Sequence, residues 1–322
     1  MSAEDETNLK DNVERPAVRR AVTMGNFDGC HMGHQALFRT LKAVAEVNGL
    51  VPTVITFEPH SNYVLYGPGD PLLLTTTEEK REFIESLGLE FLVLPFTSEV
   101  AKLPFDVFVR RELIEKRGVC SMFFGHDHCF GAGGKGNYET ITAAFPELST
   151  QMLSIVLHKG ERVSSSAVRN ALLNGDVSRA QTYLGRPYRL SGTVVEGKRL
   201  GHTIGFPTAN LQVEPYKFLP KIGVYVASAR LGGTAHGKSG EERIFRAVVN
   251  IGMQPSAPGS HQLAIEAYLL DFDENIYGEH LVLDLLAYLR PEKKFASLDD
   301  LVRQIGMDAD TAKNYNGNHW AE

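Results

Sequence analysis

The strongest constraint on the fold is a change in sequence pattern near residue 185. Before it, short apolar runs suited to β-strands alternate with segments in which apolar residues recur every three or four positions. The strand-like runs are 21–27, 51–57, 91–96, 120–125 and 152–158, and the helix-like segments are 34–47, 77–88 and 105–118. Alternation of this kind predicts an α/β domain in which helices cover both faces of a parallel sheet.

After residue 185, strand-like runs follow one another with Gly, Pro and Asp turns between them. They are 188–197, 223–231, 243–252, 263–272 and 280–290, and the next helical pattern is 297–315. Five strands without crossovers predict a small antiparallel β-barrel followed by a C-terminal helix. Residues 1–17 are polar, so we expect a disordered tail over 1–17, one domain over 18–184 and another over 185–322.

Charge and cysteine content limit the partners and the compartment. The chain of 322 residues carries 33 basic and 39 acidic side chains, a net charge of −6, whereas nucleic acids and anionic membranes attract basic proteins. The three cysteines form no CxxC pair, and no apolar run is long enough for a membrane span or a signal peptide. We therefore expect a cytoplasmic protein that has neither nucleic acid nor membrane as a partner.

The most informative stretch is GNFDGCHMGH, residues 25–34, which links the first predicted strand to the first predicted helix. Ligands of open parallel sheets bind where strands end, and a helix N-terminus there attracts phosphate. His31 and His34 are three residues apart, so both imidazoles can face that position. They could donate hydrogen bonds to oxygens that gain charge as pyrophosphate leaves, which is electrostatic catalysis without a covalent intermediate.

Other interpretations of this region remain open. Two histidines at this spacing are more often structural than catalytic, and a zinc site would need another ligand, which GHDHC (125–129) does not supply at a convincing spacing. A P-loop is disfavoured, because Cys129 stands where the motif ending at Gly134-Lys135 requires glycine. A second element, VSSSAVR (163–169), is either an ordinary helix N-cap or a phosphate cradle made of hydroxyls and a guanidinium.

Together, GNFDGCHMGH and VSSSAVR resemble the HxGH-type, Rossmann-like nucleotidyltransferase domain of the bacterial bifunctional riboflavin kinase/FAD synthetases. In that family this domain transfers AMP from ATP to FMN and releases pyrophosphate. The resemblance implies that His31 and His34 are catalytic and that His60 and Asp127 bind FMN. The ATP-binding residues that it implies are Gly25, Phe27, Asp28, Gly29, His31, His34, Ser165, Ser166 and Arg169.

The second half contains a glycine-rich, basic loop followed by GFPTAN (205–210). Glycine lets a loop approach a nucleotide closely, and Thr208 and Asn210 supply oxygen donors that suit Mg²⁺. GFPTAN resembles the PTAN motif of riboflavin kinases. The kinase ATP site implied by this resemblance comprises Gly197, Lys198, Gly201, Gly205, Pro207, Thr208 and Asn210, with Thr208 and Asn210 also binding the metal.

Glu266 is the candidate general base of the kinase. A single Glu on a strand is usually just exposed, but the family places its base in an E-x-x-L-L-D-F context, which Glu266 occupies here. The flavin-binding residues implied are Asn250, Glu266, Arg290 and Phe295. The resemblance thus implies riboflavin, FMN, FAD and ATP as substrates and products, with Mg²⁺ accompanying ATP.

Several positions in the first half depart from the family pattern. Ser61 and Asn62 follow TFEPH where the family usually has Pro-Arg, and Gly134 stands in place of an arginine. His128 replaces an aromatic residue, and Asn137 replaces an aspartate. These departures leave one alternative open, a working kinase fused to a weak or non-catalytic flavin-nucleotide sensor. An HxGH enzyme with a different phosphorylated acceptor is a second alternative, against which GFPTAN and the Glu266 strand argue.

Overall fold

The computed structural model describes residues 16–66, 73–197, 201, 204–232, 242–255 and 261–316. Lys198 and nearly all of the expected N-terminal tail therefore lie outside the described residues. The chain forms two compact units, and each is made of several segments. The first takes the described residues within 1–26, 36–67 and 84–155, and the second takes those within 27–35, 68–83 and 156–322.

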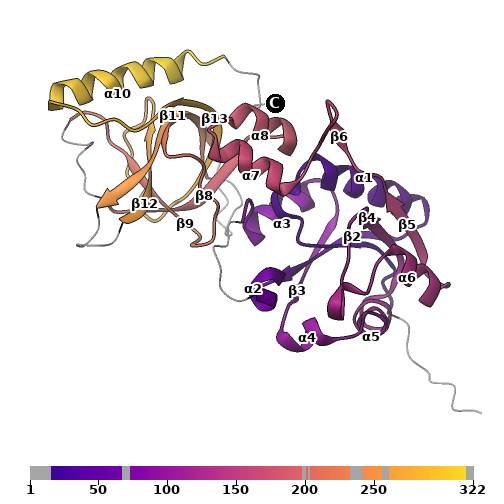
Figure 1. Cartoon of the computed structure of the whole chain (residues 1–322). Helices are drawn as coiled ribbons and strands as arrows, with labels where there is room; N and C mark the ends of the chain where they lie inside the picture. Colours follow the sequence, from indigo (N-terminus) through magenta and orange to yellow (C-terminus); the bar gives the residue numbers. More distant parts are fainter. Residues whose placement is uncertain are drawn as a thin grey trace, which may run out of the picture. The chain divides into compact units, whose positions relative to one another are not determined.

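The first unit contains a parallel five-stranded sheet with the strand order β3-β2-β1-β4-β5 (Figure 1). Its strands are β1 (Arg20–Met24), β2 (Val51–Glu58), β3 (Glu90–Pro95), β4 (Val119–Gly125) and β5 (Ser149–Leu153). Apolar side chains of β1, β2 and β4 pack with those of nearby helices to form its core. The sheet confirms the predicted α/β fold, in which β1 leads directly into the histidine-containing stretch.

The helices that begin in this half are short apart from the first and third. They are α1 (Met32–Val47), α2 (Ser61–Tyr66), α3 (Thr77–Ser86), α4 (Ser98–Lys102), α5 (Phe105–Phe108), the π-helical segment Val109–Glu115 and α6 (Tyr138–Ala144). The predicted apolar stripe of α1 is buried at Leu37, Phe38 and Leu41. Gly88 and Gly118, predicted to end helices, have φ angles of 77° and 65°, the left-handed conformation that favours glycine.

The predicted strand at 152–158 is wrong in its bounds. Strand β5 starts at Ser149 and ends at Leu153, whereas Leu157–His158 forms β6 and pairs with β7 (Glu161–Arg162). The two residues between them, Lys159 and Gly160, both have positive φ. Two central residues of this kind produce a tight antiparallel hairpin, so the apolar pattern continues through a break that it cannot reveal.

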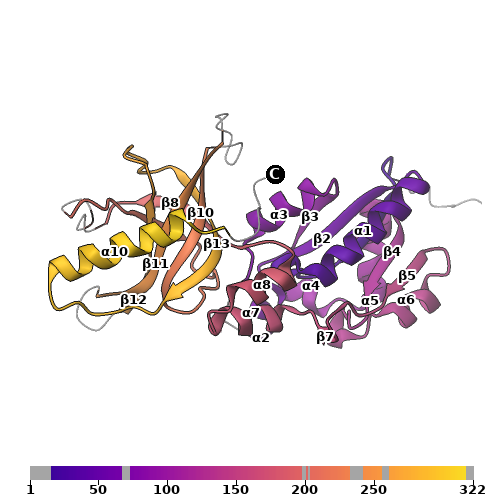
Figure 2. The same cartoon turned by 90° about the horizontal axis from the view of Figure 1, so that it is seen from above.

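The second unit contains a closed barrel with the strand order β10-β11-β12-β9-β8-β13. The strands are β8 (Tyr188–Val195), β9 (Ala209–Val213), β10 (Gly223–Leu231), β11 (Arg243–Pro255), β12 (His261–Leu269) and β13 (His280–Arg290). The helices are α7 (Ser165–Leu173), α8 (Val177–Leu184) and α10 (Leu298–Lys313), and α10 packs along β10 and β11 (Figure 2). The prediction of five strands missed β9, which has five residues and directly follows the Gly- and Pro-containing part of the GFPTAN motif in the sequence.

Candidate functional site

A tight turn holds the residues between β1 and α1. Phe27, Gly29 and Cys30 have φ angles of 46°, 80° and 42°, so three residues adopt positive φ within four positions. His31 follows with extended backbone and caps α1, because the Gln35 amide donates to the His31 carbonyl at 3.0 Å. The turn therefore places His31 at the positive end of the helix dipole, where an anion is stabilised.

The imidazoles of His31 and His34 are stacked, with ring centroids 3.6 Å apart and planes 19° from parallel. Gly33 makes room for this stack, because a Cβ at that position would lie 3.1 Å from Cε1 and Nδ1 of His31. Burial lowers the pKa of His31 to about 4 and that of His34 well below its usual value. Both rings are therefore neutral at pH 7, and each still has one N–H group to donate.

The VSSSAVR segment meets the turn at Asp28. The Ser165 hydroxyl donates to the Asp28 carbonyl at 2.8 Å, and Arg169 forms an ion pair with the Asp28 carboxylate. Burial raises the pKa of Asp28, which Arg169 partly offsets. Ser164 caps α7 by accepting from the Ala167 amide at 3.2 Å, and the predicted residue Ser166 is exposed. The segment thus caps α7 and also brings a hydroxyl and a guanidinium to the turn at residues 27–31, which we call the histidine turn.

A cavity of about 530 Å³ opens in the first unit, beside the residues that follow β1. Five aromatic side chains contribute to its wall, namely Phe57, Phe96, Phe108, His128 and Phe130. Gly25 and Asn26 also line it, and the Asn26 amide and Ser61 hydroxyl exchange hydrogen bonds of 3.0 and 3.2 Å. A flat apolar ring with a few polar groups at its edge fits such a cavity.

The two predicted FMN residues do not line this cavity. Asp127 is exposed, and the cavity wall instead includes the next residues along the chain, Ser61 after His60 and His128 after Asp127. His128 stacks on Phe130 with centroids 5.6 Å apart, and burial lowers its pKa to about 4. The residues that follow His60 and Asp127 thus line the cavity, and the FMN-binding roles of His60 and Asp127 remain predictions.

The departures from the family pattern have local explanations at two positions. Asn137 caps α6 in a reciprocal pair with Thr140, with both hydrogen bonds at 2.9 Å, so it performs a role that aspartate also performs. Gly134 lines the cavity and has a φ of 66°, a conformation that disfavours an arginine there. The side chain of Asn62 lies outside the described part of the structure.

A second cavity, of about 380 Å³, lies in the barrel unit. Glu266 on β12 pairs directly with Asn210 on β9 and with Asn250 on β11, so the three side chains form a row across neighbouring strands. Seven predicted residues line this cavity: Gly201, Thr208, Asn210, Asn250, Glu266, Arg290 and Phe295. The predicted Gly197, Gly205 and Pro207 do not line it.

Two glycines keep the loop close to these polar groups. A Cβ at Gly197 would lie 2.1 Å from Nδ2 of Asn210, and one at Gly201 would lie 2.2 Å from the Phe206 carbonyl oxygen and 3.3 Å from the Thr208 hydroxyl. Only glycine lets the backbone approach so closely. Thr208 and Asn210 both line the cavity, and hydroxyl and amide oxygens are donors that suit Mg²⁺.

Sequence reasoning missed Asp308 on α10, which also lines the barrel cavity. Its carboxylate accepts three hydrogen bonds from Arg290, at 3.1, 3.1 and 2.6 Å, and another from Gln304 at 3.0 Å. Asp308 follows Leu301 and Ile305 at helical spacing, and all three line the cavity. An acidic residue on the apolar face of the C-terminal helix was the signal that could have identified it.

The described residues contain no group of three or more His, Cys, Asp or Glu side chains that could hold a metal ion. None of the helices within those residues combines the length and apolar character needed to cross a membrane.

Comparison with known proteins finds relatives for both parts of the chain. A riboflavin kinase family model matches residues 184–316, and an FAD synthetase family model matches residues 14–167. A bifunctional riboflavin kinase/FMN adenylyltransferase from Haemophilus influenzae is 37% identical, covering 94% of this chain and 96% of the relative. One of the same description from Bacillus subtilis is 33% identical, covering 95% of each. A crystal structure described as a macrolide-efflux protein from Streptococcus pneumoniae is similar with a TM-score of 0.81 and 29% identity, covering 94% of this chain and 97% of that one.

Proposed function

This chain belongs to the bifunctional riboflavin kinase/FMN adenylyltransferase family, and from that premise we propose that it uses ATP twice, to make FMN from riboflavin and FAD from FMN. The observation that carries the proposal is the row of Asn210, Glu266 and Asn250 inside the barrel cavity. It supplies a carboxylate between two amides, which suits a hydroxyl acceptor. The relatives that combine both activities favour this function over the sensor alternative.

In the kinase reaction, Glu266 accepts the proton of the riboflavin hydroxyl while that oxygen forms a bond to the γ-phosphorus of ATP. The bond between that phosphorus and the ADP oxygen breaks, and ADP leaves. Thr208 and Asn210 would hold Mg²⁺, which neutralises charge on the transferring phosphoryl group. Arg290 and Phe295, whose guanidinium and ring centroid are 6.0 Å apart, are proposed to contact the flavin.

In the adenylyl transfer, a phosphate oxygen of FMN attacks the α-phosphorus of ATP, and the bond to the pyrophosphate oxygen breaks. His31 and His34 donate hydrogen bonds to the oxygens on which charge develops, and Ser165, Ser166 and Arg169 bind the ATP phosphates. Gly25, Phe27, Asp28 and Gly29 complete the proposed ATP site. The aromatic cavity of the first unit is the proposed flavin site, and the FMN-binding roles of His60 and Asp127 stay predictions.

The domain boundaries and the cellular compartment are also proposals. The two family models support a kinase domain within 185–322 and an adenylyltransferase domain within 18–184. The three cysteines, Cys30, Cys120 and Cys129, are free, which supports the reducing environment of the cytoplasm. We continue to expect neither nucleic acid nor membrane as a partner.

The test is to incubate the purified full chain with riboflavin, ATP and Mg²⁺ and to separate the flavins by chromatography over time. FMN appearing before FAD is the expected result. Omitting Mg²⁺, or replacing Asn210 by Ala, should slow FMN formation, and the variant should need more Mg²⁺. His31→Ala should stop the conversion of supplied FMN to FAD while FMN formation continues. FMN accumulating without FAD in the wild-type protein would leave only the kinase half of the proposal.

A further inference from the structure

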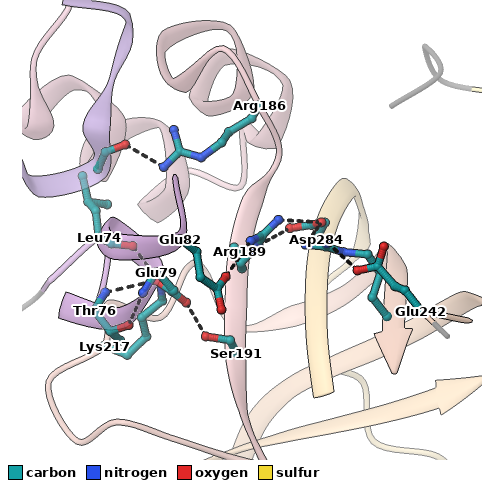
Figure 3. Close-up of polar contacts among 12 residues, drawn as sticks. Leu74, Thr76, Glu79, Glu82, Arg186, Arg189, Ser191, Lys217, Glu242 and Asp284 are labelled. Atoms are coloured by element: carbon teal, nitrogen blue, oxygen red, sulfur yellow. Dashed lines mark hydrogen bonds and ion pairs between the residues drawn. The ribbon is translucent and has the colours of Figure 1, made fainter. Parts of the chain in front are cut away.

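Arg186 binds the back of the histidine turn. It follows α8, and its guanidinium donates to the carbonyl oxygens of Gly29 at 3.0 Å, Cys30 at 3.3 Å and Leu184 at 3.3 Å. Figure 3 shows its extended side chain. The Cys30 carbonyl belongs to the peptide group whose nitrogen is that of His31, so one of these contacts fixes the peptide immediately before the first histidine.

One further contact holds Arg186 in this position, and a second side chain binds two of the same carbonyl groups. The Arg186 guanidinium lies over the ring of Phe83, 4.0 Å from the ring centroid. The side-chain amide of Gln35, on α1, donates to the same Cys30 and Leu184 carbonyls at 2.8 and 2.7 Å. The Cys30 and Leu184 carbonyls thus each accept from both Arg186 and Gln35. A stacked guanidinium that donates to several carbonyls is an arrangement that lysine cannot reproduce.

We propose that Arg186 is a positioning residue for adenylyl transfer: it fixes the Gly29–His31 backbone and keeps a positive charge behind the stacked imidazoles. The proposal rests on the catalytic function proposed for His31 and His34. It assigns a role in FAD formation to a residue within 184–316, the range that the riboflavin kinase model matches, and outside 14–167, the range of the FAD synthetase model.

The charge of Arg186 has its own measurable effect. Burial is the main cause of the low pKa of His31 and His34, and the Arg186 charge lowers both further. Charged groups that also lower these pKa values are Arg162, which acts on His31, and Lys80 and His31, which act on His34. Removing the Arg186 charge should therefore raise the pKa of the histidines, whereas Arg186→Lys should leave it close to the wild-type value.

The experiment compares Arg186→Met and Arg186→Lys with the wild-type full chain in both half-reactions. We expect kcat for FMN to FAD to fall by about ten- to a hundredfold in both variants, because small misplacements of catalytic groups cost rates of that order. Riboflavin phosphorylation should be unchanged, which also reports that the protein is folded. The acid limb of the pH–rate profile for FAD formation should move to higher pH in Arg186→Met and stay in place in Arg186→Lys.

Arg179→Met is the matched control, because Arg179 is exposed and pairs with the exposed Glu161. Wild-type FAD formation in Arg186→Lys, or an unshifted acid limb in Arg186→Met, would overturn the proposal. If Arg186→Met does not fold, the rate of Arg186→Lys decides the positioning role. If His31→Ala leaves FAD formation intact, the proposed function of the histidines fails; if His31→Ala abolishes it and the Arg186 variants do not affect it, only the role of Arg186 fails.

Discussion

Lys217 and Glu79 form an ion pair that is almost completely removed from solvent, with side-chain exposures of 0% and 4%. The Lys217 ammonium also donates to the Leu74 carbonyl at 2.8 Å (Figure 3). The Glu79 carboxylate accepts from the Thr76 amide at 3.0 Å and from the Ser191 hydroxyl at 2.7 Å. The partners named here come from residues 74–79, around the start of α3, and from the strands and loops of the barrel.

Removing one member of this pair should be costly. Lys217→Met should lower the free energy of unfolding by about 3–5 kcal/mol, because a buried carboxylate is left without its cation. The double variant Lys217→Met/Glu79→Leu should recover much of this loss. Denaturant unfolding measures both, with Lys313→Met as the control, since Lys313 is exposed and lies 3.7 Å from the exposed Asp271. Equal losses in Lys217→Met and the control would contradict the prediction.

Glu266→Gln should reduce kcat for FMN formation by about 10²- to 10⁴-fold, because the amide cannot accept the proton of the riboflavin hydroxyl. Conversion of supplied FMN to FAD should continue at the wild-type rate. The two half-reactions are followed separately by chromatography. Glu274→Gln is the control, because Glu274 is exposed and pairs with Arg243. A variant that still phosphorylates riboflavin normally would remove Glu266 from its proposed role.

Asp308→Asn should weaken riboflavin binding. The neutral amide no longer balances the Arg290 charge, and its NH₂ group cannot accept the hydrogen bonds that the second carboxylate oxygen accepts. We expect a higher KM for riboflavin and a loss of about 1–3 kcal/mol in the free energy of unfolding. Steady-state kinetics and denaturant titration measure the two effects. Asp310→Asn, an exposed position on the same helix, should change neither.

His128 should make the protein sensitive to acid. Its pKa is about 4 in the folded chain because of burial, whereas an exposed histidine has a pKa near 6.5. The unfolded chain therefore binds the proton first, so stability is fully present above about pH 6.5 and is lost as pH falls toward 4. The wild-type protein should lose about 2 kcal/mol of stability through His128 between pH 7 and pH 4.5, and His128→Phe should not show this loss.

The control for this comparison is His126→Asn, at an exposed position two residues earlier. It should lose stability between pH 7 and pH 4.5 as the wild-type protein does. His31 is buried with a similarly low pKa, so part of the acid sensitivity should persist in His128→Phe. An identical loss in His128→Phe and the wild-type protein would show that His128 is not a source of it.

Local patterns were sufficient to predict the sheet and the barrel, and the family resemblance implied seven of the residues that line the barrel cavity. The alternation of apolar residues identified β13 at its observed bounds, and GFPTAN identified Thr208 and Asn210. The opposition of Glu266 to Asn210 and Asn250 was beyond sequence reasoning, because it depends on the register of three strands, of which β9 lies far from β11 and β12 in the chain. Strand β9 was missed for the same reason, since pairing defines it more than composition does.

Other site features depend on close approach in three dimensions. Gly33 is part of the motif, but its role in making room for the His31 ring appears only when a Cβ is placed there. Arg186 had no recognisable motif, since its partners are backbone carbonyls about 155 residues earlier in the chain, as the separations of 157 and 156 residues show. Backbone acceptors have no sequence signature, so contacts of this kind cannot be read from residue types.

The second unit is built from three separate segments of the chain, which has a consequence for the exchange of gene segments between homologues. A crossover at the apparent junction near residue 185 would join one parent's Glu79 to another parent's Lys217, and one parent's histidine turn to another parent's Arg186. Such chimaeras should tolerate recombination only where both parents carry compatible partners at these positions. These buried charges and carbonyl contacts therefore determine which segments must be exchanged together. A crossover near residue 185 separates them, although the sequence pattern changes at that position.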